Sequence, residues 1–315
     1  MTGLAVTTVS RALKDAPDIG KATKERVRLV ANQIGYRPNR AGVRLRTGKT
    51  NVIALVMSIE TEPMGLTPHM VTGISRVLAP TSYHLILTPY DNSNDPLDPV
   101  RYVVETGSAD GIIISRTQQD DSRVRYLHER GFPFATHGRT DMGIQHAYHD
   151  YDNAKFAEVA VERLAKMGRK KIAILPPPQE LNYGRNMIEG FGIGLDRFDL
   201  DEVSLRGAHL ELDHDYVRDS IARIVASRNP PDGIICGSSA AVLAVVAGIE
   251  AAGFEVGKDV DVIGKESFVL LQKFRPTISV VKESFVDAGV HLANAVIAQI
   301  NGERAENFQS LEIPE

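Results

Sequence analysis

The chain has 315 residues, 43% of them apolar and 24% charged, which is typical of a globular protein with about two domains. Its single cysteine, Cys236, excludes a disulfide framework within the chain and fits a reducing compartment. The sequence has no run of about 18 to 20 apolar residues that would predict a transmembrane helix, and no apolar secretory segment follows its N-terminus. We therefore expect a cytoplasmic protein without a membrane partner.

The net charge of −4 is divided unevenly along the chain. Residues 1–50 hold 11 of the 36 Lys and Arg and three of the 40 acidic residues, so this segment carries +8. The remaining 25 basic and 37 acidic residues give the rest of the chain −12. A small basic segment joined to a large acidic body is typical of a nucleic-acid-binding module, although a solvated basic surface has the same composition.

The first elements in chain order are two short helices. Apolar residues recur at helical spacing over 6–13 and again over 23–34, and Gly35 ends the second helix. A loop rich in Pro, Gly and Asp separates the helices at 14–21. Residues 36–50 are basic and polar, so they are expected to form a linker.

The chain changes character at residue 51, where short apolar runs rich in β-branched residues begin. The runs that predict buried strands read NVIALVM, YHLILTPY, DGIIISR, FPFATHG, KKIAILPPP, DGIICGSS and VDVIGKES. Stretches with helical character separate several of these runs, near residues 68–79, 97–107, 120–130, 183–196 and 240–252. Strands that are apolar on both faces and alternate with helices predict an α/β fold with parallel sheets.

The alternation occurs twice, with a change near 140–155, so we expect two doubly wound lobes with a ligand cleft between them. The expected ligand position is the carboxyl ends of the strands. The predicted segments are a helical head at 1–35, a hinge at 36–50 and a core at 51–315, whose first lobe comprises 51–140 plus 282–303 and whose second lobe comprises 141–281 plus 304–315.

Two motifs carry a resemblance to a known family. The stretch GLAVTTVSRAL at 3–13 resembles the turn and recognition helix of the lactose-repressor/galactose-repressor (LacI/GalR) family, with its pattern G-V-S-x-x-T-V-S-R-x-L. The stretch GYRPNRAGVRL at 35–45 is similar to the family's hinge pattern Y-x-P-N-x-x-A-R-x-L. The resemblance covers essentially the whole chain. It implies a helix-turn-helix head and a core like that of periplasmic binding proteins.

The resemblance implies that the first helix lies in the major groove of operator DNA. Val6 and Thr7 match the family's main specificity positions, and Arg11 matches an arginine that can pair with guanine. Val9 and Leu13 are interpreted as core residues of the head.

Other matched positions suit contacts with the DNA backbone. Thr8, Ser10 and Asn39 fit phosphate or sugar contacts, with a capping or solvent-facing role as the alternative for Thr8. Leu45 matches the family's hinge leucine, which is wedged into a central minor-groove step and kinks the DNA. Simple packing in a linker is the alternative for Leu45.

The head and hinge also depart from the family pattern. Ala5 replaces the usual Ser, so the first helix should lack a side-chain N-cap, at a cost of about 1 kcal/mol. Gly42 and Val43 replace Ala-Arg, and we expect the hinge to be disordered until it binds operator. We expect the family's bracing first helix to be missing from this form, because only Met1 and Thr2 precede the motif. Either Met1 is an internal residue taken as the start or the chain is truncated, and this form is expected to bind operator poorly.

The resemblance also implies a small effector, commonly a sugar, in the cleft. The residues expected to bind it are Ser115, His137, Tyr183, Arg185, Asn186, Ser238, Glu266, Glu283 and Phe285. A loop role is the alternative for His137, and Arg139 is interpreted as structural. Arginine, carboxylate and aromatic side chains together suit recognition of a polyol. Because Met187, Ser238 and Ser239 depart from the family pattern, the effector is not expected to match that of a well-known member.

These observations predict a dimeric, effector-responsive transcriptional regulator, a repressor of carbohydrate-utilisation genes. Its expected partners are operator DNA, a sugar or sugar derivative and a second copy of the chain. No cofactor or metal is expected, because RTGKT lacks the earlier glycine of a phosphate-binding loop and no metal-ligand spacing occurs. The alternatives are a sugar-binding protein of a transport system and an enzyme built on the same core.

Overall fold

The computed structural model describes residues 2–36, 44, 48–58, 66–205, 208–267 and 270–314. The chain divides into two compact units, residues 1–50 and 51–315. In the first unit, α1 (Val6–Leu13) packs against α2 (Lys21–Gln33), with Ala12 and Val27 buried. The prediction of these two helices is confirmed. The expected loss of the N-cap is confirmed too, because Ala5 makes no side-chain cap hydrogen bond.

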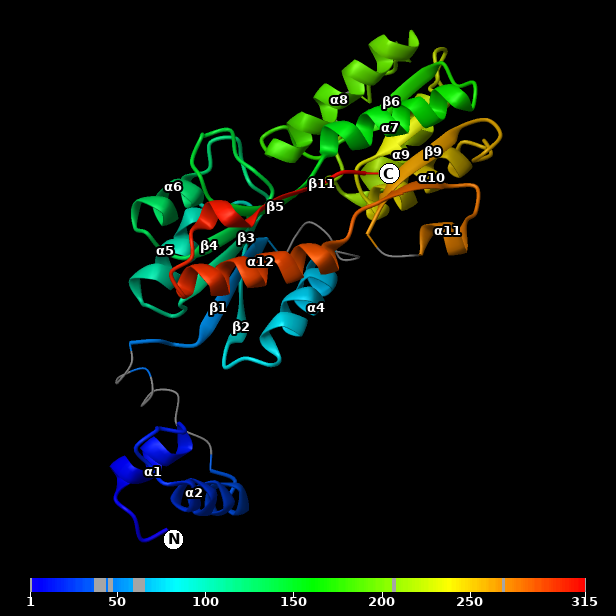
Figure 1. Ribbon diagram of the computed structural model, residues 1–315. Helices are drawn as coiled ribbons and strands as arrows, with labels where there is room; N and C mark the ends of the chain where they lie inside the picture. The colour runs from blue at the N-terminus through cyan, green and yellow to red at the C-terminus, as the bar shows by residue number, and fades with distance from the viewer. Residues whose placement is uncertain are drawn as a thin grey trace. The chain divides into compact units, whose positions relative to one another are not determined.

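The first lobe of the second unit is a parallel sheet covered by helices on both faces (Figure 1). Its strands, in spatial order, are β2 (His84–Tyr90), β1 (Val52–Ser58), β3 (Gly111–Ser115), β4 (Phe134–His137), β5 (Ala147–Tyr151) and β11 (Gln309–Glu312). One face carries α4 (Leu66–Leu78) and α12 (Phe285–Ile300), and the other carries α5 (Leu97–Glu105) and α6 (Ser122–Glu129). A short 3-10 helix, η1 (Ala305–Phe308), leads into β11.

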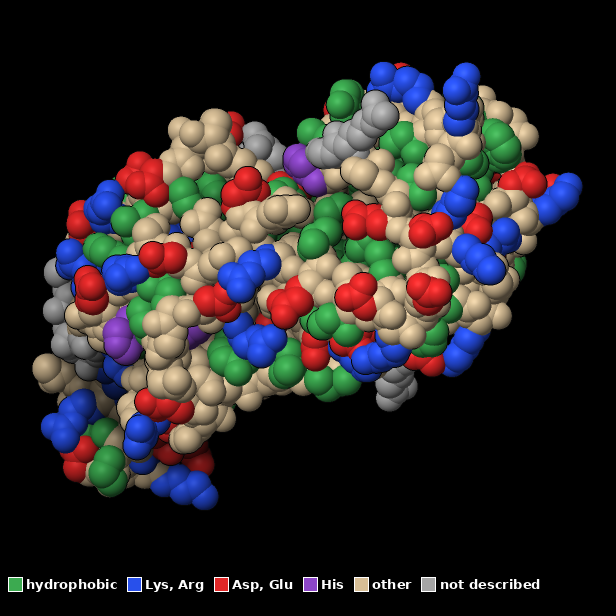
Figure 2. Space-filling view, turned by 90° about the horizontal axis from the view of Figure 1, so that it is seen from above, with side chains coloured by type: hydrophobic (Ala, Val, Ile, Leu, Met, Phe, Trp, Pro, Cys, Tyr) green, Lys and Arg blue, Asp and Glu red, His purple; other side chains and the backbone are tan. Residues whose placement is uncertain are grey.

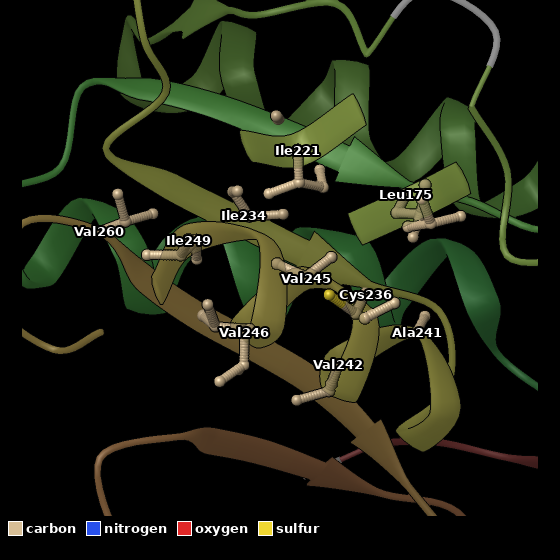
Figure 3. Close-up of a cluster of buried hydrophobic side chains, with 14 of the residues drawn as sticks. Leu175, Ile221, Ile234, Cys236, Ala241, Val242, Val245, Val246, Ile249 and Val260 are labelled. Carbon is tan, nitrogen blue, oxygen red and sulfur yellow. The ribbon is translucent and has the colours of Figure 1, made fainter. Parts of the chain in front are cut away.

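The second lobe repeats this architecture with a sheet of its own. Its strands, in spatial order, are β7 (Asp201–Glu202), β6 (Lys171–Leu175), β8 (Gly233–Cys236), β9 (Asp261–Glu266) and β10 (Ser279–Lys282). The helices α7 (Asn153–Lys166) and α8 (Asn182–Phe198) cover one face, and α9 (His214–Val225) and α10 (Ser239–Ala251) cover the other. A single turn, α11 (Leu271–Phe274), follows β9. Figure 3 shows the apolar core between this sheet and the layer of α9 and α10.

The strands are apolar throughout because both faces of each sheet are buried. Successive side chains of a strand point to opposite faces. In β3, Ile113 packs toward α4 and α12, whereas Ile112 and Ile114 pack toward α5 and α6. The same alternation in β8 sends Cys236 toward α10 and Ile235 toward α7. The α/β prediction is therefore confirmed by strands that pair in parallel register.

Helix α8 packs closely against α7, and two glycines of α8 differ in the space that a side chain would find there. A Cβ added at Gly190 would lie 2.0 Å from the carbonyl oxygen of Ala154 in α7. A Cβ added at Gly192, two residues along the same helix, would meet nothing within 4 Å. Gly190 is thus a packing requirement of the second lobe, and Gly192 is not.

The structure corrects the expected composition of the lobes at two places. Residues 147–151 and 309–312 were expected in the second lobe, but they form β5 and β11 of the first sheet and pair in parallel. The amide of Asp152 extends this pairing by donating to the carbonyl of Glu312. Between β1 and β11, the chain passes between the lobes at 151–153, where β5 leads into α7, and at 282–285, where β10 leads into α12.

The surface of the protein carries both signs of charge. Acidic and basic side chains are interspersed on the face seen in Figure 2, so this face has no extended patch of one sign. Among the described residues, no helix has the length and apolar character needed to cross a membrane.

Candidate functional site

Helix α1 presents an exposed face at its N-terminal end. Val6 is 84% exposed, the highest value among the large apolar side chains of the described residues, and Thr7 is also exposed. The Arg11 guanidinium is exposed and lies 2.7 Å from the Asp18 carboxylate. Exposure of an apolar, a hydroxyl and a cationic side chain along one short helix suits contact with base edges.

The remaining sequence-predicted positions of the head are more covered. Thr8 and Ser10 are half-buried, as are Val9 and Leu13. Asn39 and Leu45, expected to contact the DNA backbone and the minor groove, lie outside the residues that the structure describes, as do Gly42 and Val43 of the hinge.

A cavity lies between the lobes of the second unit, with about 930 Å³ of empty space including its open mouth. The carboxyl ends of strands from both sheets supply its walls, as expected for parallel sheets. First-lobe strands contribute Ser58, Ser115, His137 and Asp150, and second-lobe segments contribute Gly237, Ser238, Ser239 and Lys265. Most of the residues expected to bind effector line this cavity, namely Ser115, His137, Tyr183, Ser238, Glu283 and Phe285.

Arg185, Asn186 and Glu266 were also expected there, but they do not line the cavity. Arg185 Nη1 instead donates to Asp141 Oδ2 and Gln119 Oε1 of the first lobe, at 3.0 Å each. Asn186 is half-buried on α8 beside it.

Glu266 has a different role from the one expected. Its Oε1 accepts hydrogen bonds from the amides of Leu270 and Leu271, at 2.9 and 2.7 Å. The carboxylate therefore holds the segment that begins α11. A carboxylate that caps a helix start in this way cannot be recognised from its position at the end of a strand alone.

An ion pair that the sequence did not suggest joins the lobes across the cavity. Arg116 follows β3 in the first lobe, and Glu211 precedes α9 in the second lobe. The guanidinium binds both carboxylate oxygens of Glu211, with Nη2 and Oε2 3.0 Å apart. Both side chains are largely buried, at 14% and 10% exposed. This two-pronged geometry is the strongest form of arginine–carboxylate pairing.

The backbone of Arg116 is held by the buried ion pair of Arg123 and Asp121. Arg116 has a φ of +58°, in the left-handed region that non-glycine residues seldom adopt. Its carbonyl accepts a hydrogen bond of 2.9 Å from Arg123 Nη2. Arg123 is itself buried and paired with Asp121, whose carboxylate also accepts from the amide of Gln118. The loop is therefore held in the conformation that directs Arg116 into the cavity.

A second ion pair lies where the chain passes between the lobes. Lys265 Nζ is 3.1 Å from Glu283 Oε2 and also donates to Asn153 Oδ1. It lies 4.7 Å from the centre of the Tyr151 ring, within range of a cation–π contact. Burial raises the pKa of Glu283, while Lys265 opposes this effect. Sequence reasoning placed Glu283 in the site but missed Lys265 beside it.

Two polar groups in the cavity wall have no partner among the described residues. Ser115 Oγ and His137 Nε2 are buried without a hydrogen bond, and Glu283 Oε1 is 3.9 Å from Nε2, too far to accept one. Burial, with smaller contributions from the charges of His149 and Lys265, lowers the pKa of His137 to about 3, so the ring is neutral at pH 7. Buried polar groups without partners are costly, and a polar ligand would satisfy them.

Aromatic rings complete the wall. Phe285 meets His137 edge to face, with 5.5 Å between ring centres, and Tyr183 stands at the start of α8. The cavity thus combines ring surfaces with hydroxyl, imidazole and paired ionic groups. This combination suits a small molecule that has apolar faces and many hydrogen-bonding groups.

Comparison with known proteins identifies the family. Residues 2–39 match the bacterial regulatory proteins of the lacI family, and residues 161–315 match the periplasmic binding protein-like domain. The HTH-type transcriptional regulator RafR of Escherichia coli is 30% identical over 315 residues, which cover 98% of this chain and 92% of RafR. The chain belongs to the LacI family. This LacI-family regulator is therefore a DNA-binding transcription regulator and not an enzyme, as the sequence predicted.

Solved structures of similar fold cover the whole chain. The lac repressor dimer bound to operator and the anti-inducer ONPF has a TM-score of 0.83 at 17% identity, covering 100% of this chain and 94% of that one. The complex of the transcriptional regulator CelR with cellobiose has a TM-score of 0.73 at 23% identity, covering 100% and 95%. At these identities the likeness shows that the LacI-family regulator shares their fold.

Proposed function

We propose that this LacI-family regulator is a cytoplasmic repressor of carbohydrate-utilisation genes whose affinity for its operator is set by a sugar. The observation that carries the proposal is the cavity between the lobes. Its unpartnered Ser115 and His137, its ionic pairs and its ring surfaces match the hydroxyls and the apolar faces of a saccharide. A relative of the same fold, CelR, was solved with cellobiose, which supports a saccharide here.

The proposed operator contacts come from α1. Val6, Thr7 and Arg11 would face base edges, because they are the exposed residues of the helix that resembles the family's recognition helix. Thr8, Ser10 and Asn39 are proposed to contact the DNA backbone, and Leu45 the minor groove. The charge of +8 on residues 1–50 supports binding to a polyanion.

We propose a homodimer on a pseudo-palindromic operator, because two copies related by a two-fold axis match two half-sites. The lac repressor, which shares the fold, was solved as a dimer bound to operator. A sugar between the lobes would change their orientation, since Asn153 and Glu283 belong both to the cavity and to the segments that join the lobes. Such coupling typically changes operator affinity by about 1–3 kcal/mol.

The test begins with selection of an operator from random duplexes by the full chain. Gel shifts with that duplex are then titrated with a panel of saccharides, and thermal unfolding is measured with the same panel. A saccharide that raises the melting temperature and also changes operator affinity is the expected result. Saccharides that change neither quantity would contradict the proposed sugar control.

A further inference from the structure

The cavity holds no cation that is free to bind an anion, as far as the chain is described. The cationic side chains among its described lining residues are Arg116 and Lys265. Arg116 is paired with Glu211 and Lys265 with Glu283, and both carboxylates also line the cavity. A third lining carboxylate, Asp150, is paired with Arg139 at 2.6 Å. The lining carboxylates therefore outnumber the lining cations.

An anionic ligand would meet these carboxylates at short range. A phosphate or uronate that took the place of a carboxylate on Arg116 would leave Glu211 buried and unpaired, which is strongly unfavourable. The neutral ring of His137 offers no positive charge in compensation. A sugar hydroxyl donates to a carboxylate and accepts from a guanidinium, so an uncharged sugar can bind without breaking either pair.

We propose that the cavity selects an uncharged saccharide, and that Glu211 enforces this choice by occupying the guanidinium of Arg116. The inference rests on the proposed sugar control and specifies the class of sugar. It also assigns a specificity role to Glu211, a residue outside every motif in the sequence.

The two cations of the cavity differ in the partners that each would keep if its carboxylate were neutralised. Lys265 also contacts Asn153 and the Tyr151 ring, so it stays occupied without Glu283. The guanidinium of Arg116 hydrogen-bonds to Glu211 alone among the described residues. The Arg116 backbone is held by Arg123, which does not depend on Glu211. Neutralising Glu211 therefore leaves a cation that points into the cavity and lacks a counter-charge.

The decisive variant is Glu211→Gln, which keeps the shape of the side chain and one acceptor but removes the negative charge. The probes are neutral saccharides (cellobiose, maltose, melibiose and raffinose) and anionic sugars (glucuronate, galacturonate and glucose 6-phosphate). Binding to the full chain is measured by thermal unfolding and calorimetry. The wild type should respond to a neutral probe and to no anionic one. Glu211→Gln should bind at least one anionic probe about tenfold or more tightly than the wild type, and added salt should reduce this gain.

Asp141→Asn is the matched control. It removes another carboxylate that bridges the lobes, but its partner Arg185 lies outside the cavity lining. This variant should keep the wild-type preference for neutral probes. Binding of anions by Asp141→Asn as well would overturn the role of Glu211, because loosened lobes would then explain the gain.

The remaining outcomes separate this inference from the proposed function. A wild type that binds an anionic sugar overturns the inference and leaves sugar control intact. A folded Glu211→Gln variant that still ignores anions overturns the role of Glu211. A wild type that responds to no saccharide of either kind overturns the proposed sugar control, and the inference with it. The comparison of neutral with anionic probes on the wild type tests the inference even if Glu211→Gln does not fold.

Discussion

The buried guanidinium of Arg123 binds the carbonyl of Arg116 and is itself paired with the carboxylate of Asp121. Burial raises the pKa of Asp121, but the Arg123 charge together with hydrogen bonds from Arg123 and the Gln118 amide outweighs burial, so the pKa is lowered overall and the pair is ionised at pH 7. One ion pair thus supports both the stability of the first lobe and the position of a cavity-lining cation.

Arg123→Met should lower the free energy of unfolding by about 3–5 kcal/mol, because it leaves the Asp121 carboxylate buried without its partner. Urea unfolding of the full chain measures the change. The double variant Asp121→Asn with Arg123→Met should recover part of the loss, since no charge is then buried. A single variant within 1 kcal/mol of the wild type would show that the pair is not needed.

Arg11→Ala should remove discrimination at one base pair of the operator, by about 1–3 kcal/mol, while leaving saccharide binding unchanged. Its pair with Asp18 is exposed, so stability should change little. Gel shifts against operators mutated at single positions measure the effect. Arg28→Ala, which removes an equally charged exposed residue of α2, is the control and should weaken all sequences alike. An Arg11→Ala variant that discriminates among the mutated operators as the wild type does would refute the recognition role of α1.

Gly190 and Gly192 should respond to alanine in opposite directions. Gly190→Ala places a methyl group against the Ala154 carbonyl and should destabilise the protein by about 1–3 kcal/mol. Gly192→Ala has open space and should stabilise α8 by about 0.5–1 kcal/mol. Chemical denaturation of the two variants provides the comparison. Equal effects would mean that α7 and α8 do not approach as described.

His137 should make stability depend on pH. Its pKa is about 3 in the folded chain, against 6.5 ordinarily, so the unfolded chain binds the proton first. The stability that His137 contributes is therefore complete above pH 6.5 and falls as the pH drops from 6.5 toward 3. His137→Gln should flatten the unfolding free energy across this window relative to the wild type. Parallel curves for the two proteins would place the pH dependence in other groups.

Local patterns predicted most of the second unit because parallel strands buried on both faces leave a continuous apolar signal. The exceptions are instructive. Strand β5 reads AYHDY, and its buried His149 and Asp150 depend on Glu312 and Arg139, which other segments supply. A polar strand whose partners lie in other segments has no local signature, so residues 147–151 were assigned to the wrong lobe.

The same limit of local sequence patterns applies to the residues of the cavity. Residues at strand ends, such as Ser115 and His137, were predictable because parallel strands present their carboxyl ends together. Glu211 was not, because it lies in an irregular segment and its partner Arg116 is 95 residues away in sequence. Arg185 was misplaced because its helix turns it toward Asp141 rather than into the cavity.

The segments that join the lobes at 151–153 and 282–285 have a mechanical consequence. In a rigid rotation about these segments, displacement grows with distance from the axis. A ligand that contacts Asn153, Glu283 and Phe285 lies close to this rotation axis, where the displacement of the lobes is smallest. A sub-ångström shift of the residues around the cavity would therefore produce a larger displacement at the far ends of the lobes. A small change caused by a ligand near the axis is thus amplified with distance from that axis.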